Sequence, residues 1–316
     1  MYRKLHTRLK SMVAMACAMV MVVASGQALA SVNDGSADRP LRVVLVPADG
    51  GTEDGTRKDF QPIFNAVANA TGLNFDLRVG QSYGAVVEAM CNGSADIAWF
   101  GPVSYLQARA LGCADLLAMA VSKGQSVYYS GIFARTDSGI ETLQDARGKK
   151  LALGDINSTS SFNIPVAMML REGIDPARDT ASVTMAGSHA NVLSALAQGL
   201  VDIGGASFDS YEKALNAGAI DAKDVRIIAK SAPLPYPPLA IQPNVDPSIK
   251  ARLQDAFDRV HTLPDITPEQ IRGYGGKRVD RYTSEVSEEA MAEVGDMLNA
   301  VSRDVKQSIL AAGNAR

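Results

Sequence analysis

Three consecutive hydroxyl side chains, Ser158, Thr159 and Ser160, follow a predicted strand and open a predicted helix. The first amides of a helix have no internal hydrogen-bond partners, and the helix dipole favours negative charge at that end. Three hydroxyl donors at the same point would suit a tetrahedral oxyanion. Ordinary helix capping is the alternative, because Ser and Thr are favoured N-cap residues. Since one cap residue would suffice, we interpret the segment as an anion-binding helix start.

Tyr83 and His189 occupy matching positions in two similar segments. The sequence from Ser82 to Ile97 aligns without a gap with the sequence from Ser188 to Ile203, and each segment reads as a helix, a glycine and a strand. Such units resemble one another in many α/β proteins, which is the alternative explanation. We interpret the repeat as two similarly built lobes with a ligand cleft between them. A histidine at this helix start could donate a hydrogen bond to an anion, whereas a solvated loop histidine is the alternative.

Two further side chains are expected at such a cleft. Asp209 follows a predicted strand and, if it faces the cleft, would accept a hydrogen bond from a protonated oxyanion; capping the next helix is the alternative. Tyr128 and Tyr129 precede a predicted crossing strand, and alternation along a strand directs one of them to the cleft. By contrast, Asp96 leads into a buried strand, where a structural role is expected.

The rest of the composition disfavours catalysis, metal binding and nucleic-acid binding. The chain shows no nucleophile–base pair, metal-ligand cluster or phosphate loop with a lysine, and the glycine-rich segment from Gly50 to Gly55 is acidic. The formal net charge is −3, without a basic run. We therefore predict a protein that is not an enzyme, binds no cofactor or metal, and holds any anion with amides and hydroxyls.

The N-terminus has the pattern of an export signal. A basic start precedes an apolar run from Met12 to about Ser25, and Ala28-Leu29-Ala30 fits a signal-peptidase site. We predict that residues 1–30 are a signal peptide, that residues 31–40 are a flexible lead-in, and that the mature protein is soluble in the periplasm.

The predicted compartment also bears on the cysteines. Cys17 lies within the apolar run, away from the cleavage point, which argues against a lipid anchor. The other two cysteines, Cys91 and Cys113, are expected to form a disulfide in an oxidising compartment. A thiolate pair that binds a soft metal or arsenite is the alternative, although no third ligand is available nearby.

Strands and helices alternate along the mature chain, which predicts parallel sheets with helices on both faces. Tyr128–Arg135 is predicted to cross to a second lobe and the proline-rich segment 233–238 to return, so that two crossings make a hinge. We predict one lobe from residues 41–134 plus 236–316 and the other from residues 135–235. Two late helices, at residues 248–263 and 285–310, are expected to pack on the first of these lobes.

The chain resembles the substrate-binding proteins of phosphonate, phosphite and phosphate ABC transporters. The similarity is carried, in order, by Ser82-Tyr83, the run from Ala95 to Tyr105, Asn157–Ser160, Gly187–His189 and Pro233–Pro235. It implies a type II periplasmic-binding fold, in which each lobe is a mostly parallel sheet flanked by helices and two crossover strands form the hinge. The lobes of such a protein close on a phosphonate-type anion and deliver it to a membrane permease.

The resemblance also implies roles for individual residues. The helix start would bind the oxyanion, and a histidine, an acid and two aromatic walls would complete the site: Ser158, Thr159, Ser160, His189, Asp209, Tyr83 and Tyr128. Ser161 replaces a glycine found in many members, and a second acid for an amino group is not evident. Phosphite, methylphosphonate and phosphate therefore remain as ligands, ahead of an aminophosphonate.

The predicted function is capture of a small phosphorus oxyanion in the periplasm and its delivery to an ABC permease, by a monomer. The alternative is a receptor with the same fold that signals to a membrane sensor kinase.

Overall fold

The first lobe is built on a six-stranded sheet in the order β13-β4-β12-β3-β1-β2. The structure, a computed structural model, describes residues 33–48 and 53–314. The strands of this sheet are β1 (Leu41–Leu45), β2 (Phe75–Val79), β3 (Ile97–Trp99), β4 (Asp115–Val121), β12 (Pro238–Ile241) and β13 (Arg281–Thr283). Its central strands are buried along almost their whole length, because helices cover both faces.

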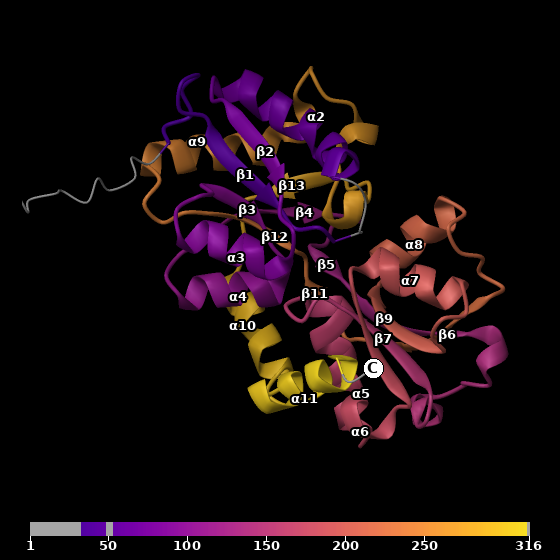
Figure 1. Ribbon diagram of the computed structural model, residues 1–316. Coiled ribbons are helices and arrows are strands. Elements are labelled where there is room, and N and C mark those ends of the chain that lie inside the picture. Colours follow the sequence, from indigo (N-terminus) through magenta and orange to yellow (C-terminus); the bar gives the residue numbers. More distant parts are fainter. Residues whose placement is uncertain (1–32, 49–52, 315–316) are drawn as a thin grey trace, which may run out of the picture. The chain divides into compact units, whose positions relative to one another are not determined.

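The helices of the first lobe lie on the two faces of that sheet (Figure 1). One face carries α2 (Glu53–Thr71) and α9 (Pro247–Arg259), which contact each other, and the other carries α3 (Tyr83–Cys91) and α4 (Pro102–Ala110). None of the helices within the described residues is long and apolar enough to cross a membrane.

The second lobe is built on a five-stranded sheet in the order β10-β6-β9-β7-β8. Its strands are β6 (Ser130–Arg135), β7 (Lys150–Gly154), β8 (Ser182–Gly187), β9 (Ile203–Ser207) and β10 (Val225–Lys230). Its main helices are α5 (Ile164–Arg171), α6 (Pro176–Asp179), α7 (His189–Ala197) and α8 (Phe208–Asn216). The strands β7, β8 and β9 are parallel, whereas β6 runs antiparallel to β9 and β10.

Both sheets are thus parallel in most of their strands. In each, a strand next to a crossing segment, β6 or β12, is inserted in the antiparallel direction. The predicted two-lobed α/β fold is confirmed.

Two crossing segments lie side by side between the lobes. A short strand, β5 (Val127–Tyr128), pairs antiparallel with β11 (Leu234–Pro235). The single crossing strand predicted at Tyr128–Arg135 is therefore interrupted at Tyr129, where the chain passes from β5 into β6. Paired short strands of this kind are suited to a hinge, because few residues need to change their backbone angles.

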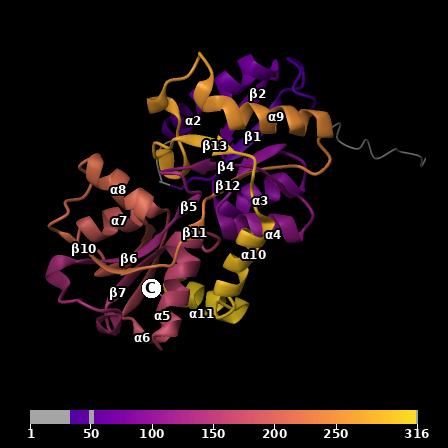
Figure 2. The ribbon, with the colours of Figure 1, turned by 180° about the vertical axis from the view of Figure 1, so that it is seen from behind.

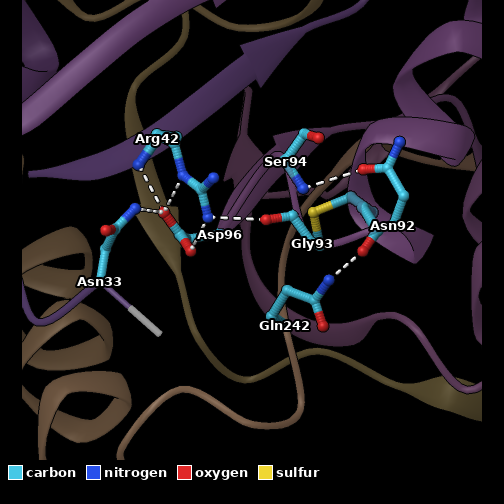
Figure 3. A network of polar contacts seen from close by, with 8 residues as sticks. Asn33, Arg42, Asn92, Gly93, Ser94, Asp96 and Gln242 are labelled. Atoms are coloured by element: carbon cyan, nitrogen blue, oxygen red, sulfur yellow. Dashed lines mark hydrogen bonds and ion pairs between the residues drawn. The ribbon is translucent and has the colours of Figure 1, made fainter. Parts of the chain in front are cut away.

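The predicted flexible lead-in is partly wrong, because residues 33–40 make specific contacts with the first lobe. The Asn33 side chain donates a hydrogen bond of 2.8 Å to the buried carboxylate of Asp96, which also accepts from Arg42 (Figure 3). The carbonyl of Gly35 accepts from the Asn74 amide at 2.8 Å. The structural role expected for Asp96 is confirmed. The predicted signal peptide, residues 1–30, lies outside the described residues.

The C-terminal segment connects the two lobes a third time. The helix α10 (Glu288–Met297) packs on α4 of the first lobe, as predicted. The next helix, α11 (Arg303–Asn314), instead packs on β8 and α6 of the second lobe (Figure 2). The prediction that the whole segment returns to the first lobe is therefore wrong. Val301 and Ile309 are buried in the second-lobe core because they cover its edge strand.

A disulfide joins Cys91 and Cys113 in the first lobe, as predicted from the sequence. It connects the end of α3 to the segment just before β4 and closes a loop that contains α4.

Candidate functional site

The three predicted hydroxyl residues lie at a helix start in the second lobe, directly after β7. Ser158 is the N-cap, and its Oγ accepts hydrogen bonds from the Ser161 amide at 3.2 Å and from the Ser161 hydroxyl at 2.7 Å. A π-helical turn, Thr159–Asn163, follows and leads into α5. The amides of Thr159 and Ser160 occupy the first two helical positions, which have no carbonyl partner within a helix.

The three hydroxyls have different surroundings. Ser158 acts as the helix N-cap, so the alternative of ordinary helix capping holds for this residue. The Thr159 Oγ1 accepts a hydrogen bond of 2.9 Å from the Val103 amide at the start of α4, so it joins the two lobes. The Ser160 Oγ is buried and close to the Tyr128 phenol, but among the described residues it makes no hydrogen bond of normal distance and angle. A ligand oxygen that accepts its proton would give this buried hydroxyl a well-formed hydrogen bond.

His189 is buried beside this helix start and presents one N–H to it. Its Nδ1 accepts a hydrogen bond from the Ser207 amide at 2.9 Å, so the ring proton resides on Nε2. The Nε2 lies 3.4 Å from Ser158 Oγ and 3.0 Å from the Tyr274 hydroxyl. Burial lowers the pKa of His189 from 6.5 to about 3, so the imidazole is neutral at physiological pH and Nε2–H is a donor. His189 is therefore not a solvated loop residue, which was the alternative interpretation.

Tyr83 reaches the same place from the first lobe. Its hydroxyl lies 2.5 Å from the hydroxyl of Tyr274, which in turn contacts His189. Burial raises the pKa of Tyr83 far above its usual value, so the phenol keeps its proton. Hydrogen-bonding groups therefore run without interruption from Ser158 in one lobe to Tyr83 in the other.

Tyr274 belongs to the same group of side chains and was not predicted from the sequence. Its ring packs against the rings of Tyr128 and His189, at centroid distances of 5.8 and 5.9 Å. The residue starts a turn in which Gly275 and Gly276 adopt φ values of 68° and 72°, where glycine is favoured. The sequence signal that could have indicated this residue is its place between Gly273 and Gly275. Glycines on both sides favour a turn, and a turn can present a large side chain away from helices and strands.

Of the two neighbouring tyrosines, Tyr128 packs against Tyr274 and Tyr129 does not take part in the site. Tyr128 is buried, and the hydroxyls of Ser160 and Thr159 lie near enough to lower its pKa, although burial raises it by more. Tyr129 instead lies under the Lys230 ammonium, 3.7 Å from the ring centroid. We name the assembled set the donor cluster: Tyr83, Tyr128, Ser158, Thr159, Ser160, His189 and Tyr274.

Asp209 lies outside the donor cluster and already has partners for both carboxylate oxygens. Its Oδ1 accepts from the Lys277 ammonium at 2.7 Å, and its Oδ2 accepts from the Tyr236 hydroxyl at 3.3 Å. Burial raises the pKa of Asp209, against the opposing effect of Lys277. A buried carboxylate is costly without a compensating cation, and Lys277 provides that cation here. Lys277 also contacts Glu212 at 3.1 Å, so it joins a first-lobe loop to α8.

Further hydrogen bonds connect the lobes around the donor cluster. The Asp155 carboxylate accepts from the Tyr83 amide at 3.3 Å, and the His189 amide donates to the Ala48 carbonyl at 3.1 Å. Gln107 donates to the Asn157 side chain at 3.0 Å. The two helix starts that carry Tyr83 and Ser158 are therefore held face to face.

A cavity of about 710 Å³ adjoins the donor cluster and shares Tyr274 with it. The described residues that line it do not include Ser158, Thr159 or Ser160. The cavity therefore contacts the donor cluster at Tyr274, and the helix start lies outside its lining.

Comparison with known proteins identifies the family. Residues 51–270 match the family model for the phosphonate periplasmic substrate-binding protein of ABC transporters. The chain belongs to this family. The family predicted from the sequence motifs is confirmed.

The chain is also similar to two proteins over much of their length. It is 27% identical to the phosphate-import protein PhnD of Mycolicibacterium smegmatis over 228 residues, which cover 69% of this chain and 70% of that protein. It is 24% identical to the phosphonates-binding periplasmic protein of Escherichia coli over 68% of this chain and 64% of that protein.

Solved structures show the same fold. A binding component of an ABC phosphonate transporter from Pseudomonas aeruginosa has a TM-score of 0.73 at 20% identity, covering 88% of this chain and 90% of that one. PhnD1 from Prochlorococcus marinus in complex with methylphosphonate has a TM-score of 0.73 at 14% identity, covering 83% and 97%. At these identities, the similarity establishes the architecture.

Proposed function

We propose that this protein binds a small phosphorus oxyanion at the donor cluster and delivers it to an ABC permease, without catalysis. The observation that carries the proposal is the buried, unpartnered Ser160 Oγ at a helix start that faces His189 Nε2–H. Two ring donors of the cluster are neutral, since burial keeps the His189 imidazole uncharged and the Tyr83 phenol protonated. The anion would thus be stabilised by oriented dipoles and the helix start.

The donors suit a tetrahedral ligand with several oxygens. One oxygen would accept from Ser160 Oγ and the amides of the helix start. A second oxygen would accept from His189 Nε2–H, in place of the Tyr274 hydroxyl that lies 3.0 Å from it. Tyr83 and Tyr128 would donate from the opposite side. Asp209 has a different role in this proposal: it forms an ion pair with Lys277 and does not accept a ligand proton.

A thermal-shift screen of the protein tests the proposal. The panel contains phosphite, methylphosphonate, phosphate, 2-aminoethylphosphonate, sulfate and arsenite. We expect at least one phosphorus oxyanion to raise the melting temperature with its concentration, since a ligand that binds only the folded state stabilises it by mass action. If none of the phosphorus compounds shifts the transition, this function is wrong.

Delivery to a permease has its own test. We infer export to the periplasm and removal of residues 1–30, in keeping with the family. Deletion of the gene is expected to abolish uptake of the ligand identified in the screen, and the wild-type gene should restore it. A receptor for a sensor kinase would leave uptake by the permease intact and abolish only a transcriptional response.

A further inference from the structure

The cavity beside the donor cluster is larger than a small inorganic anion requires. Its volume of about 710 Å³ falls in the range of roughly 300–1,000 Å³ that is usual for organic ligands. Both lobes contribute to its walls, from the end of β1 and from α2 on one side and from α7 and α8 on the other. Much of the wall is apolar: Leu45, Val46, Phe60, Trp99, Leu193 and Ile220.

Tyr274 and Ala190 connect this cavity to the donor cluster. Tyr274 lines the cavity, while its hydroxyl lies 3.0 Å from His189 Nε2 and 2.5 Å from the Tyr83 hydroxyl. Ala190 also lines the cavity and directly follows His189. A head group bound to His189 would therefore lie one side chain away from the apolar walls.

The two acidic residues in the described lining of the cavity, Asp59 and Glu269, each lie within 4 Å of a cation of the protein. Asp59 lies 3.6 Å from the Lys213 ammonium, and Glu269 lies 3.7 Å from the Arg278 guanidinium. Nearby, Asp209 is paired with Lys277. Among the described residues that line the cavity, no acid other than Asp59 and Glu269 is present to receive an ammonium group of a ligand.

We propose that the cavity receives the organic group of a phosphonate whose head group binds the donor cluster. The ligand class is phosphonates with an uncharged, apolar substituent of several carbons, such as an alkyl chain or a phenyl ring. This inference rests on the proposed function of the donor cluster and adds the substrate class to it.

Calorimetry with methylphosphonate, hexylphosphonate and 6-aminohexylphosphonate tests the inference. Each buried methylene group contributes roughly threefold to affinity, so hexylphosphonate should bind on the order of 30-fold more tightly than methylphosphonate if at least three of its five additional methylene groups are buried. The terminal ammonium should remove most of that gain. Ala214→Trp, at a half-buried wall position on α8, should reduce binding of hexylphosphonate but not of methylphosphonate. Ala217→Trp, at a second wall position, serves if the first variant does not fold.

The matched control is Asn216→Trp, on the same helix but exposed and outside the cavity lining. It should leave the affinity for both ligands unchanged. Equal affinities for methylphosphonate and hexylphosphonate would overturn the substrate class while leaving the oxyanion site intact. Failure of both ligands, together with phosphite and phosphate, would overturn the proposed function itself.

Discussion

Acidification from pH 6.5 to about pH 4 is expected to lower the free energy of unfolding by about 3 kcal/mol through His189 alone. Burial lowers the pKa of this residue from 6.5 to about 3 in the folded protein. Between these two values the unfolded chain binds a proton at His189 that the folded protein does not bind. Stability therefore falls as the pH falls through this window, by about 1.4 kcal/mol per pH unit, and levels off below pH 3.

The variant His189→Asn isolates this contribution. Its side-chain oxygen can still accept from the Ser207 amide, but the residue does not titrate. Burial raises the pKa of Asp155 and Asp209, whose effects on stability have the opposite sign, and these effects cancel when the two proteins are compared. Urea denaturation at a series of pH values should show that the wild type loses more stability than the variant. Parallel pH profiles would contradict the buried, neutral state of His189.

Removal of the disulfide by Cys91→Ala and Cys113→Ala is expected to cost about 3 kcal/mol of folding stability. The bond joins cysteines separated by 22 residues, and such a cross-link chiefly limits the freedom of the unfolded chain. Urea denaturation of wild type and double variant measures the difference. The ligand affinity should stay the same, since Cys91 lies at the opposite end of α3 from Tyr83.

Reductant provides the control for the disulfide. It should lower the stability of the wild-type protein to that of the double variant and leave the variant unaffected. A wild-type midpoint that does not respond to reductant, or that equals the midpoint of the variant, would show that the bond contributes little.

Local sequence patterns were enough to predict the fold and most of the donor cluster. The repeat that relates Tyr83 to His189 marks two helix starts, and the fold brings both side chains to the Tyr274 hydroxyl. The run from Ser158 to Ser160 was equally informative, because helix starts have unpaired amides whatever the surrounding structure. Periodicity also predicted the alternation of strands and helices that gives both sheets.

Features that depend on distant parts of the chain were not predicted. Tyr274 enters the donor cluster through a loop that no local pattern connects with Ser158. Lys277 forms an ion pair with Asp209, a pairing that no local pattern around Asp209 indicated. The helix α11 was assigned to the wrong lobe, because its apolar stripe fits any exposed sheet edge and only the folded chain selects β8.

The most direct test of the oxyanion site is calorimetric titration of Ser160→Ala with the phosphorus oxyanion found in the screen. Loss of the unpartnered hydroxyl is expected to weaken binding by one to two orders of magnitude, about 1.5–3 kcal/mol for a charge-assisted hydrogen bond. Ser158→Ala and His189→Ala should have effects of similar size. Ser308→Ala, at an exposed position on α11, should bind as the wild type does. Wild-type affinity in Ser160→Ala, Ser158→Ala and His189→Ala would contradict an anion site at this helix start.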